Sequence, residues 1–391
     1  MVKLSYTLFG IVFLALAART LPWLVSLNMK LINAVLKGNS TGSAAFSPFL
    51  LTHNMLVFSA FTGAGPTAKQ INEAMMFFVH LDDFTNATRD LNSDYMDRTS
   101  EETNEFRAMG KERQTNSDNI GLLKDEGTHL VPVGIRIESA WFVGKDFLPD
   151  EETEKALATL NKWITQNTNQ KIEFFINETS PDMKINLVLT AYFNAEWKYA
   201  FDPKLTKKVD FHTSANTVTP VDMMSITGEF VLEYIKAIDT DVLHLPFKQK
   251  HLKMTLLVPR KIDGINTLIQ NLTMVHMTNL HRRGKARPVN VQLPKFKIDS
   301  EDDLKKPMQD LGIHDLFSNV NISKLATSKG PLKVDHIIQR VVLDVDERGA
   351  EVAFASRTSL KPQHIVVDRP FLFLVREDND VYFAGRVNFT P

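Results

Sequence analysis

Alternating and continuous runs of apolar residues predict most of the β-structure in this 391-residue chain. Residues 134–149 and 288–299 alternate apolar with polar side chains, as strands with one buried face do. Residues 184–203 hold a strongly apolar stretch that is typical of a fully buried strand. Residues 242–260 predict a hairpin, and residues 381–391 predict a closing strand.

Helical spacing of apolar residues marks three further segments. Residues 24–32 and 154–172 place their large apolar side chains on one helical face. Residues 303–317 predict a helix that ends near Gly312, because glycine readily adopts the backbone conformation that ends a helix. Strands and helices are mixed along the chain without a linker or repeat, which favours one α+β domain.

Residues 44–75 predict two successive helices. Pro48 suits the first turn of a helix, and Gly63 and Gly65 can end it. Thr67 is expected to cap the short helix that follows. Residues 81–131 are then rich in polar and charged residues with almost no apolar runs, so we expect a polar excursion rather than a separate domain.

The composition is that of a globular protein with a large core, with 43% hydrophobic and 23% charged residues. The net charge of -1 gives no reason to expect nucleic acid or a membrane as a partner. The chain has no cysteine, which excludes disulfides, thiol nucleophiles and thiolate metal sites. A large core must therefore stabilise the fold without covalent cross-links.

The N-terminus has the features of a secretory signal peptide over residues 1–17. Lys3 gives a basic start, residues 4–16 are apolar, and a small-x-small pattern ends at Ala17. The apolar run is short for a membrane span. We therefore expect a secreted, extracellular glycoprotein. Its N-glycosylation sequons are at Asn39, Asn86, Asn177, Asn271, Asn321 and Asn388.

No enzymatic motif is present in the sequence. It lacks a Gly-rich phosphate loop, a His-Glu-x-x-His motif and a Gly-x-Ser-x-Gly motif. The histidines have no metal-ligand spacing, and His276 and His281, the nearest pair of interest, are expected to be solvated. We therefore expect no catalytic residue, no metal and no cofactor, and we do not expect an enzyme.

A series of short motifs runs along the chain. In order, they include AAFSPFLL, GAGPTAKQI, WITQNTNQKI, YFNAEWKYAFDPKLTKKVDF, LPFKQKHLKMTLLVP, VQLPKFKID, LGIHDLF, DVDERGAEVAFAS, DRPFLFLV and FAGRV. Their order resembles that of the serpin family, a large fold of serine protease inhibitors. The resemblance covers most of residues 25–391, apart from the polar excursion. No single motif is decisive, and it is their shared order that is specific.

The resemblance implies one serpin-like α+β domain over residues 18–391. It would contain a large mixed central β-sheet, two further sheets and about eight to nine helices. It would also expose a reactive loop near the C-terminus, over residues 347–369. In inhibitory members a protease cleaves this loop and stays acylated on it, and the hinge before the cut inserts into the main sheet as a new strand.

The resemblance also places the hinge of this loop. Its residues are Glu347, Gly349, Ala350, Glu351, Val352, Ala353, Phe354, Ala355 and Ser356. Successive side chains of an inserted strand point to opposite faces, so Ala350, Val352, Phe354 and Ser356 would face inward together. Phe354 is larger than the residues usual here, and its overpacking would cost about 1–3 kcal/mol.

Three residues are candidates for the bait position of the reactive loop. We favour the Arg357–Thr358 bond, because the specificity pocket of a trypsin-like protease carries a carboxylate and binds Arg or Lys. Lys361 is weaker, because Pro362 after it obstructs tryptic cleavage. Gln363 is the residue reached by the family's usual spacing from the hinge glycine. The loop is a few residues short, which is why the two ways of counting disagree.

Other departures from the family favour a non-inhibitory binding or carrier protein as the alternative. The family holds its main sheet shut with a helix serine, a strand asparagine and a strand histidine. Here Leu50 stands for a serine, Gln339 stands for the histidine, and the asparagine is missing from a shortened strand. Insertion requires a loop that is long enough and a sheet that can open.

A cluster of basic residues is a candidate site for a sulfated polysaccharide. The cluster consists of His281, Arg282, Arg283, Lys285 and Arg287. A solvated turn between a helix and a strand is the simpler interpretation. The expected partners are therefore a trypsin-like serine protease and, as a candidate, a sulfated glycan, with the protein itself a monomer.

Overall fold

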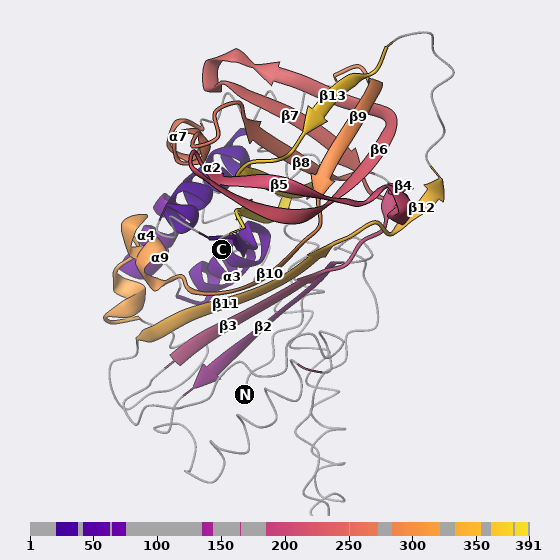
Figure 1. Ribbon diagram of the computed structural model, residues 1–391. Helices are drawn as coiled ribbons and strands as arrows, with labels where there is room; N and C mark the ends of the chain where they lie inside the picture. Colours follow the sequence, from indigo (N-terminus) through magenta and orange to yellow (C-terminus); the bar gives the residue numbers. More distant parts are fainter. Residues whose placement is uncertain are drawn as a thin grey trace, which may run out of the picture.

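Three β-sheets form the framework of the protein (Figure 1). The computed structural model describes residues 21–37, 42–62, 65–75, 135–143, 165, 185–249, 251–272, 284–320, 333–352, 361–377 and 380–389. Within these ranges it contains five α-helices and three short 3-10 helices. The predicted large mixed sheet and additional sheets are confirmed, whereas the predicted helix count and exposed loop stay predictions.

The largest sheet has nine strands and carries most of the buried aromatic side chains. Its strands in spatial order are β1 (Ala44–Phe46), β15 (Asp380–Val387), β14 (Phe371–Glu377), β8 (Leu252–Pro259), β7 (Thr240–Pro246), β6 (Thr217–Ile235), β9 (Arg287–Pro294) and β13 (Gln363–Val366), with β5 (Lys207–Ser214) paired to β6. The predicted hairpin and closing strand are thus β7–β8 and β15.

The second sheet has four strands, in the order β10 (Phe296–Asp303), β11 (Val334–Val345), β3 (Ile185–Phe193) and β2 (Ile135–Val143). The third pairs β12 (Gly349–Val352) with β4 (Trp197–Ala200). One alternating stretch was predicted over residues 288–299, but the chain passes there from the nine-stranded sheet into the four-stranded one. Pro294 has no N–H to continue a ladder, and Lys295 lies between the two strands.

The N-terminal helices α2 (Leu21–Leu36), α3 (Pro48–Thr62) and α4 (Pro66–Ala74) lie together between these sheets (Figure 1). As predicted, α3 begins at Pro48, and the Ser47 hydroxyl accepts a hydrogen bond from the Leu50 N–H at 3.2 Å. The predicted Thr67 cap is wrong, because Gly65 precedes the helix and Thr67 is buried inside it.

The remaining helices are short. They are α7 (Ile265–Asn271), α9 (Lys305–Asp310), η2 (Pro203–Leu205), η3 (Lys236–Ile238) and η4 (Asp315–Phe317). Gly312 follows α9 with φ of 97°, a left-handed conformation that confirms the predicted helix end. No helix in the described ranges is both long and apolar enough to cross a membrane.

The core joins the nine-stranded sheet to the four-stranded one through aromatic side chains. Phe193 of β3 contacts Phe383 of β15 edge to face, with 5.5 Å between ring centroids. Gly385 lies next to this layer, where β1 and β14 flank β15. A Cβ at Gly385 would lie 2.5 Å from the ring of Phe373 and 2.6 Å from the carbonyl oxygen of Ala44. Only glycine fits there.

We expect the substitution Gly385→Ala to lower the free energy of unfolding by about 1–3 kcal/mol, because the added methyl group overpacks the core. Urea unfolding followed by tryptophan fluorescence measures this change. Gly42→Ala is the matched control, because no heavy atom lies within 4 Å of its Cβ position. Equal effects of the two substitutions would contradict the packing explanation.

Candidate functional site

The seam between β11 and β3 is the one parallel pairing in the four-stranded sheet. The two strands pair from Val334 opposite Ile185 to Leu343 opposite Phe193, and antiparallel β10 and β2 flank them. The parallel ladder between these two strands forms the seam.

Gln339 of β11 ties the seam to the layer beneath it. Its side-chain oxygen accepts a hydrogen bond from the Ser47 N–H at 2.7 Å, and its Nε2 donates to the Ser47 carbonyl oxygen at 3.3 Å. The Ser47 hydroxyl in turn donates to the carbonyl oxygen of Tyr382 at 2.7 Å. Gln339 is fully buried, so water cannot replace these bonds.

This geometry changes the interpretation of the sequence departures. Leu50 is an apolar core residue, and Gln339 makes two hydrogen bonds to one backbone unit, which a single amide can do because it is both donor and acceptor. β3 also places a buried asparagine, Asn186, opposite His336. The sequence could not identify Ser47 as the partner, because a backbone acceptor leaves no sequence signal.

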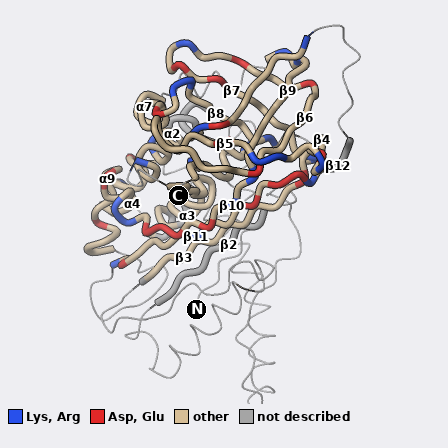
Figure 2. Tube along the Cα trace, viewed as in Figure 1, with Lys and Arg blue, Asp and Glu red and all other residues tan. Residues whose placement is uncertain are grey.

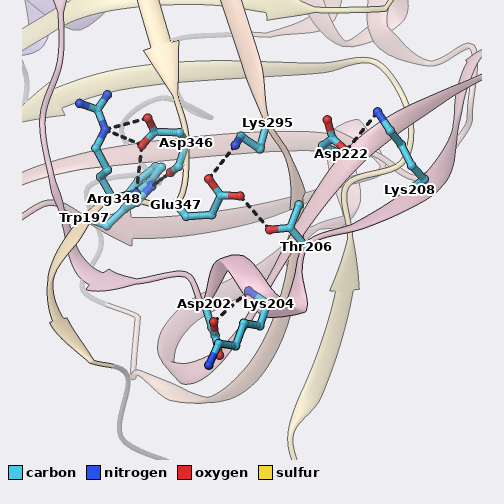
Figure 3. A network of polar contacts seen from close by, with 10 residues as sticks. All are labelled: Trp197, Asp202, Lys204, Thr206, Lys208, Asp222, Lys295, Asp346, Glu347 and Arg348. Carbon is cyan, nitrogen blue, oxygen red and sulfur yellow. Dashed lines mark hydrogen bonds and ion pairs between the residues drawn. The ribbon is translucent and has the colours of Figure 1, made fainter.

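The base of the predicted hinge is held by a charged side chain, Glu347 (Figure 3). One carboxylate oxygen of Glu347 forms an ion pair with Lys295 at 2.8 Å, and the other accepts a hydrogen bond from the Thr206 hydroxyl at 2.8 Å. Only 12% of the Glu347 side chain is exposed. Three segments far apart in the sequence thus meet at one carboxylate.

Burial raises the pKa of the Glu347 carboxyl, but the hydrogen bonds from Lys295 and Thr206 outweigh burial and hold that pKa below its ordinary value. The same contact raises the pKa of the Lys295 ammonium. Both groups are therefore charged at neutral pH. We call the contacts of Glu347 with Lys295 and Thr206 the hinge latch.

Trp197 fixes the residue before the latch. Its indole N–H donates to the carbonyl oxygen of Asp346 at 2.8 Å, and its ring stacks on Phe247 with 4.5 Å between centroids. The Asp346 carboxylate accepts hydrogen bonds from the guanidinium of Arg348 at 2.7 and 2.9 Å. Figure 2 shows cationic and anionic segments close together at this end of the molecule, around β4 and β12.

The hinge residues 349–352 form β12 and pair with β4. The backbone N–H groups of Trp197 and Phe201 donate to the carbonyl oxygens of Arg348 and Glu347, at 3.0 and 3.1 Å. A Cβ at Gly349 would lie 2.5 Å from the Cα of Ala200, so the close approach requires glycine. The start of the hinge is therefore strand-paired outside the seam. The prediction that the side chains of residues 350–356 alternate between the two faces of an inserted strand concerns side chains that the structure does not describe.

The candidate bait residues are only partly described. Arg357 and Thr358, with hinge residues Ala353, Phe354, Ala355 and Ser356, lie outside the described residues. Lys361 is exposed, and Gln363 opens β13, where it pairs with Val289 of β9. A residue engaged in a strand ladder is a poor substrate for a protease cleft, which binds an extended segment. Gln363 is thus part of the ladder between β13 and β9.

The basic cluster is also partly described. His281, Arg282 and Arg283 lie outside the described residues, whereas Lys285 and Arg287 are exposed at the start of β9. One acidic residue lies close to this cluster. Glu233 is on neighbouring β6, and one of its carboxylate oxygens would lie 2.6 Å from a Cβ at Gly284. Acidic neighbours reduce the local attraction for a polyanion.

Two of the sequons are described. Asn271 ends α7 with an exposed side chain. Asn388 is half-buried, and its backbone N–H donates to the Ser43 hydroxyl at 3.0 Å. Asn39, Asn86, Asn177 and Asn321 lie outside the described residues. In the described part of the chain, no three metal-ligating side chains gather into a metal site.

Comparison with known proteins agrees with this arrangement. The family model for serpin (serine protease inhibitor) matches residues 24–389, and the chain therefore belongs to the serpin family. Serine protease inhibitor 42Dd of Drosophila melanogaster is 34% identical over 240 residues, which are 59% of this chain and 63% of that protein. Iripin-2 of Ixodes ricinus is 29% identical over 362 residues, 88% of this chain and 87% of that protein.

Solved structures share the fold. Serpin48, described as a highly specific serpin of the insect Tenebrio molitor, is 25% identical, with a TM-score of 0.72 over 95% of this chain and 98% of that one. The matches to 42Dd and to Iripin-1 of Ixodes ricinus each cover 63% of those relatives' own length. Several relatives carry inhibitor names, and the family as a whole is one of protease inhibitors rather than catalytic enzymes.

We expect Glu347→Gln to release β12, because the neutral amide loses the ion pair with Lys295. Hydrogen exchange of the amides of residues 349–352, read by mass spectrometry, should become faster, with β14 unchanged. The pKa of the Glu347 carboxyl in the folded protein lies below its unfolded value of about 4.5. The latch should therefore be intact above pH 4.5 and should be lost as the pH falls through the lower, folded pKa.

Asp222→Asn is the matched control for the latch. Asp222 forms an ion pair with Lys208 in the same region, but the side chains are 50% and 67% exposed, so this pair contributes little. A wild-type exchange rate in Glu347→Gln, or equal acceleration in both variants, would count against the latch.

We expect Gln339→Leu to lower the free energy of unfolding by about 1–3 kcal/mol, because it leaves the buried N–H of Ser47 unpaired, whereas the Ser47 carbonyl keeps its hydrogen bond from the Leu51 N–H. Urea unfolding measures the change. Gln363→Leu, at an exposed position of β13, should change it by less than about 0.5 kcal/mol. If the two variants proved equally stable, the seam would not depend on this amide.

Proposed function

We propose that this chain is a secreted inhibitor of a trypsin-like serine protease that acts by strand insertion. The observation that carries the proposal is the closed parallel seam between β3 and β11, with the hinge paired to β4 beside it rather than within it. A strand inserted between β3 and β11 would replace their one ladder of backbone hydrogen bonds by two ladders, one on each of its edges. These added hydrogen bonds and contacts would lower the free energy of the cleaved protein. The hinge lies next to the seam it would enter.

The proposed reaction begins when the protease serine attacks the carbonyl carbon of Arg357. The Arg357–Thr358 peptide bond breaks, the amine of Thr358 takes a proton and leaves, and an ester joins Arg357 to the protease. Residues 350–357 are then free to leave β4 and enter between β3 and β11. The placement of Gln363 in β13 supports Arg357 as the bait, because Gln363 is committed to a ladder.

The hinge latch has a defined role in this proposal. Glu347 lies at the turning point between β11, which would stay in its sheet, and β12, which would have to reverse direction. The latch and the β12–β4 pairing oppose premature insertion. Gln339 has a different role. It fixes β11 to Ser47, so that β11 would stay in place while β3 separates from β11.

Secretion is proposed from the signal-like residues 1–17. Asn271 is the described sequon best placed to carry a sugar, because its side chain is exposed at a helix end. A sulfated polysaccharide stays a predicted partner of residues 281–287, although the carboxylate of Glu233 lies close to Gly284. A monomeric state stays a prediction as well.

A binding or carrier protein of serpin fold is the second candidate. The observation that favours it is the buried Gln339 amide, because it fixes β11 to Ser47 and so opposes opening of the four-stranded sheet. The two functions differ in what happens after cleavage. A cut loop that inserts raises the melting temperature of the protein, whereas a loop that stays outside leaves it unchanged.

We expect a mixture with trypsin to contain a complex that survives SDS and has the summed mass of both chains. Arg357→Gln should lower the second-order rate of inhibition by about 100-fold or more, because the trypsin pocket then lacks its cation. Lys361→Gln is the matched control and should inhibit like the wild type. Release of active trypsin with a cut loop and no complex would overturn the inhibitor proposal.

A further inference from the structure

An open groove lies between helix α2 and the junction of β10 with α9. The two helices that flank it lie side by side (Figure 1). The groove has a volume of about 1030 Å³. Small-molecule sites in proteins have volumes of about 300–1,000 Å³, so this groove is large enough for a ligand and some water. Its lining residues belong neither to the seam nor to the hinge latch, so it is separate from the candidate functional site.

The floor of the groove is apolar. Ala34 and Val35 of α2 line one side, and Leu304, Pro307 and Leu311 line the other. Leu304 is fully buried and the other four are half-buried, so this apolar surface lies below the exposed charged side chains around it. A hydrocarbon chain placed on the floor would be removed from water together with these side chains, which is favourable.

The α2 side of the groove is cationic. Lys30 and Lys37 line it, and both are exposed. They are seven residues apart, which places them on the same side of the helix and about 10 Å apart along its axis. Among the described residues, neither ammonium group has an ion-pair partner.

The acidic residues on the opposite side already have partners. The Nδ1 of His336 lies 2.6 Å from a carboxylate oxygen of Asp303, and Asp310 forms an ion pair with Lys306 within α9. Asp302 accepts a hydrogen bond from a serine hydroxyl at 3.0 Å, and burial raises the pKa of its carboxyl group. The charge in the groove that lacks a partner is therefore positive.

We propose that this groove binds one single-chain amphiphile with an anionic head, such as a fatty acid. The carboxylate head lies between Lys30 and Lys37, and the hydrocarbon chain lies on the floor over Leu304. A sulfated polysaccharide would gain from the two lysines but has no apolar chain for the floor. The inference goes beyond protease inhibition and does not rest on it, because it concerns the uncleaved protein and no residue of the reactive loop.

The test is isothermal titration calorimetry of decanoate with the full uncleaved protein at neutral pH, below the critical micelle concentration of decanoate. We expect one decanoate to bind per protein. Decyltrimethylammonium has the same chain with the opposite charge and should bind at least about tenfold more weakly. Acetate has the head without the chain and should not bind measurably. Equal affinities for the two amphiphiles, or several decanoates per protein, would overturn the proposal.

Reversal of both lysines tests the head site. The double substitution Lys30→Glu and Lys37→Glu should lower the affinity for decanoate by about tenfold or more, because two attractive charges become repulsive. The matched control is Lys69→Glu with Lys236→Glu, which changes the net charge equally at exposed lysines that do not line the groove. The control should bind decanoate like the wild type. Equal affinities of the two double variants would place the decanoate elsewhere and contradict the proposal.

The floor is tested with the lysines left in place. Ala34→Phe should lower the affinity for decanoate by about fivefold or more, because the larger side chain fills the groove. A crystal of the wild-type protein soaked with 10-bromodecanoate gives an independent readout. An anomalous bromine peak between α2 and α9 is expected, and a crystal without a peak in this groove would refute the site.

Discussion

The parallel pairing of β3 with β11 is the constraint on which the rest of this structure depends. Both strands are buried, and each is held on its outer side by an antiparallel neighbour. The contacts that hold the predicted hinge and the Gln339 amide lie at one end of this pair or underneath it. Trp197, Glu347 and β12 lie where the strands end, and Gln339 connects the middle of β11 to Ser47. The geometry of one seam therefore organises the hinge, the latch and the amide contact.

Elements with a strong periodic pattern could be predicted from the sequence. β2, β3, the β7–β8 hairpin and β15 were recognised because alternation or a continuous apolar run directly reflects burial. The end of α9 at Gly312 was recognised for a similar reason, since a left-handed residue favours glycine. The predicted cap at Thr67 was wrong, because the residue that precedes the helix is Gly65, and glycine can take this position as well. The prediction of one strand over residues 288–299 was also wrong, because an alternating pattern does not reveal that the chain changes from one sheet to another.

The site was less predictable than the fold. Motif order gave the bounds of the predicted hinge, but Glu347, Lys295 and Thr206 come from three distant segments, and no local pattern connects them. Gln339 was identified as a departure, yet its effect depends on a backbone partner that only the three-dimensional arrangement supplies.

The two sides of the loop belong to different sheets, and this has a consequence for a cleaved molecule. The chain before the loop ends in β12, whereas the chain after it supplies β13, β14 and β15. Phe371, Phe373 and Phe383 of that C-terminal piece are fully buried. A break in the loop would therefore yield two polypeptides on a denaturing gel but a single particle in native mass spectrometry, since the smaller fragment forms the middle of the hydrophobic interior and cannot diffuse away.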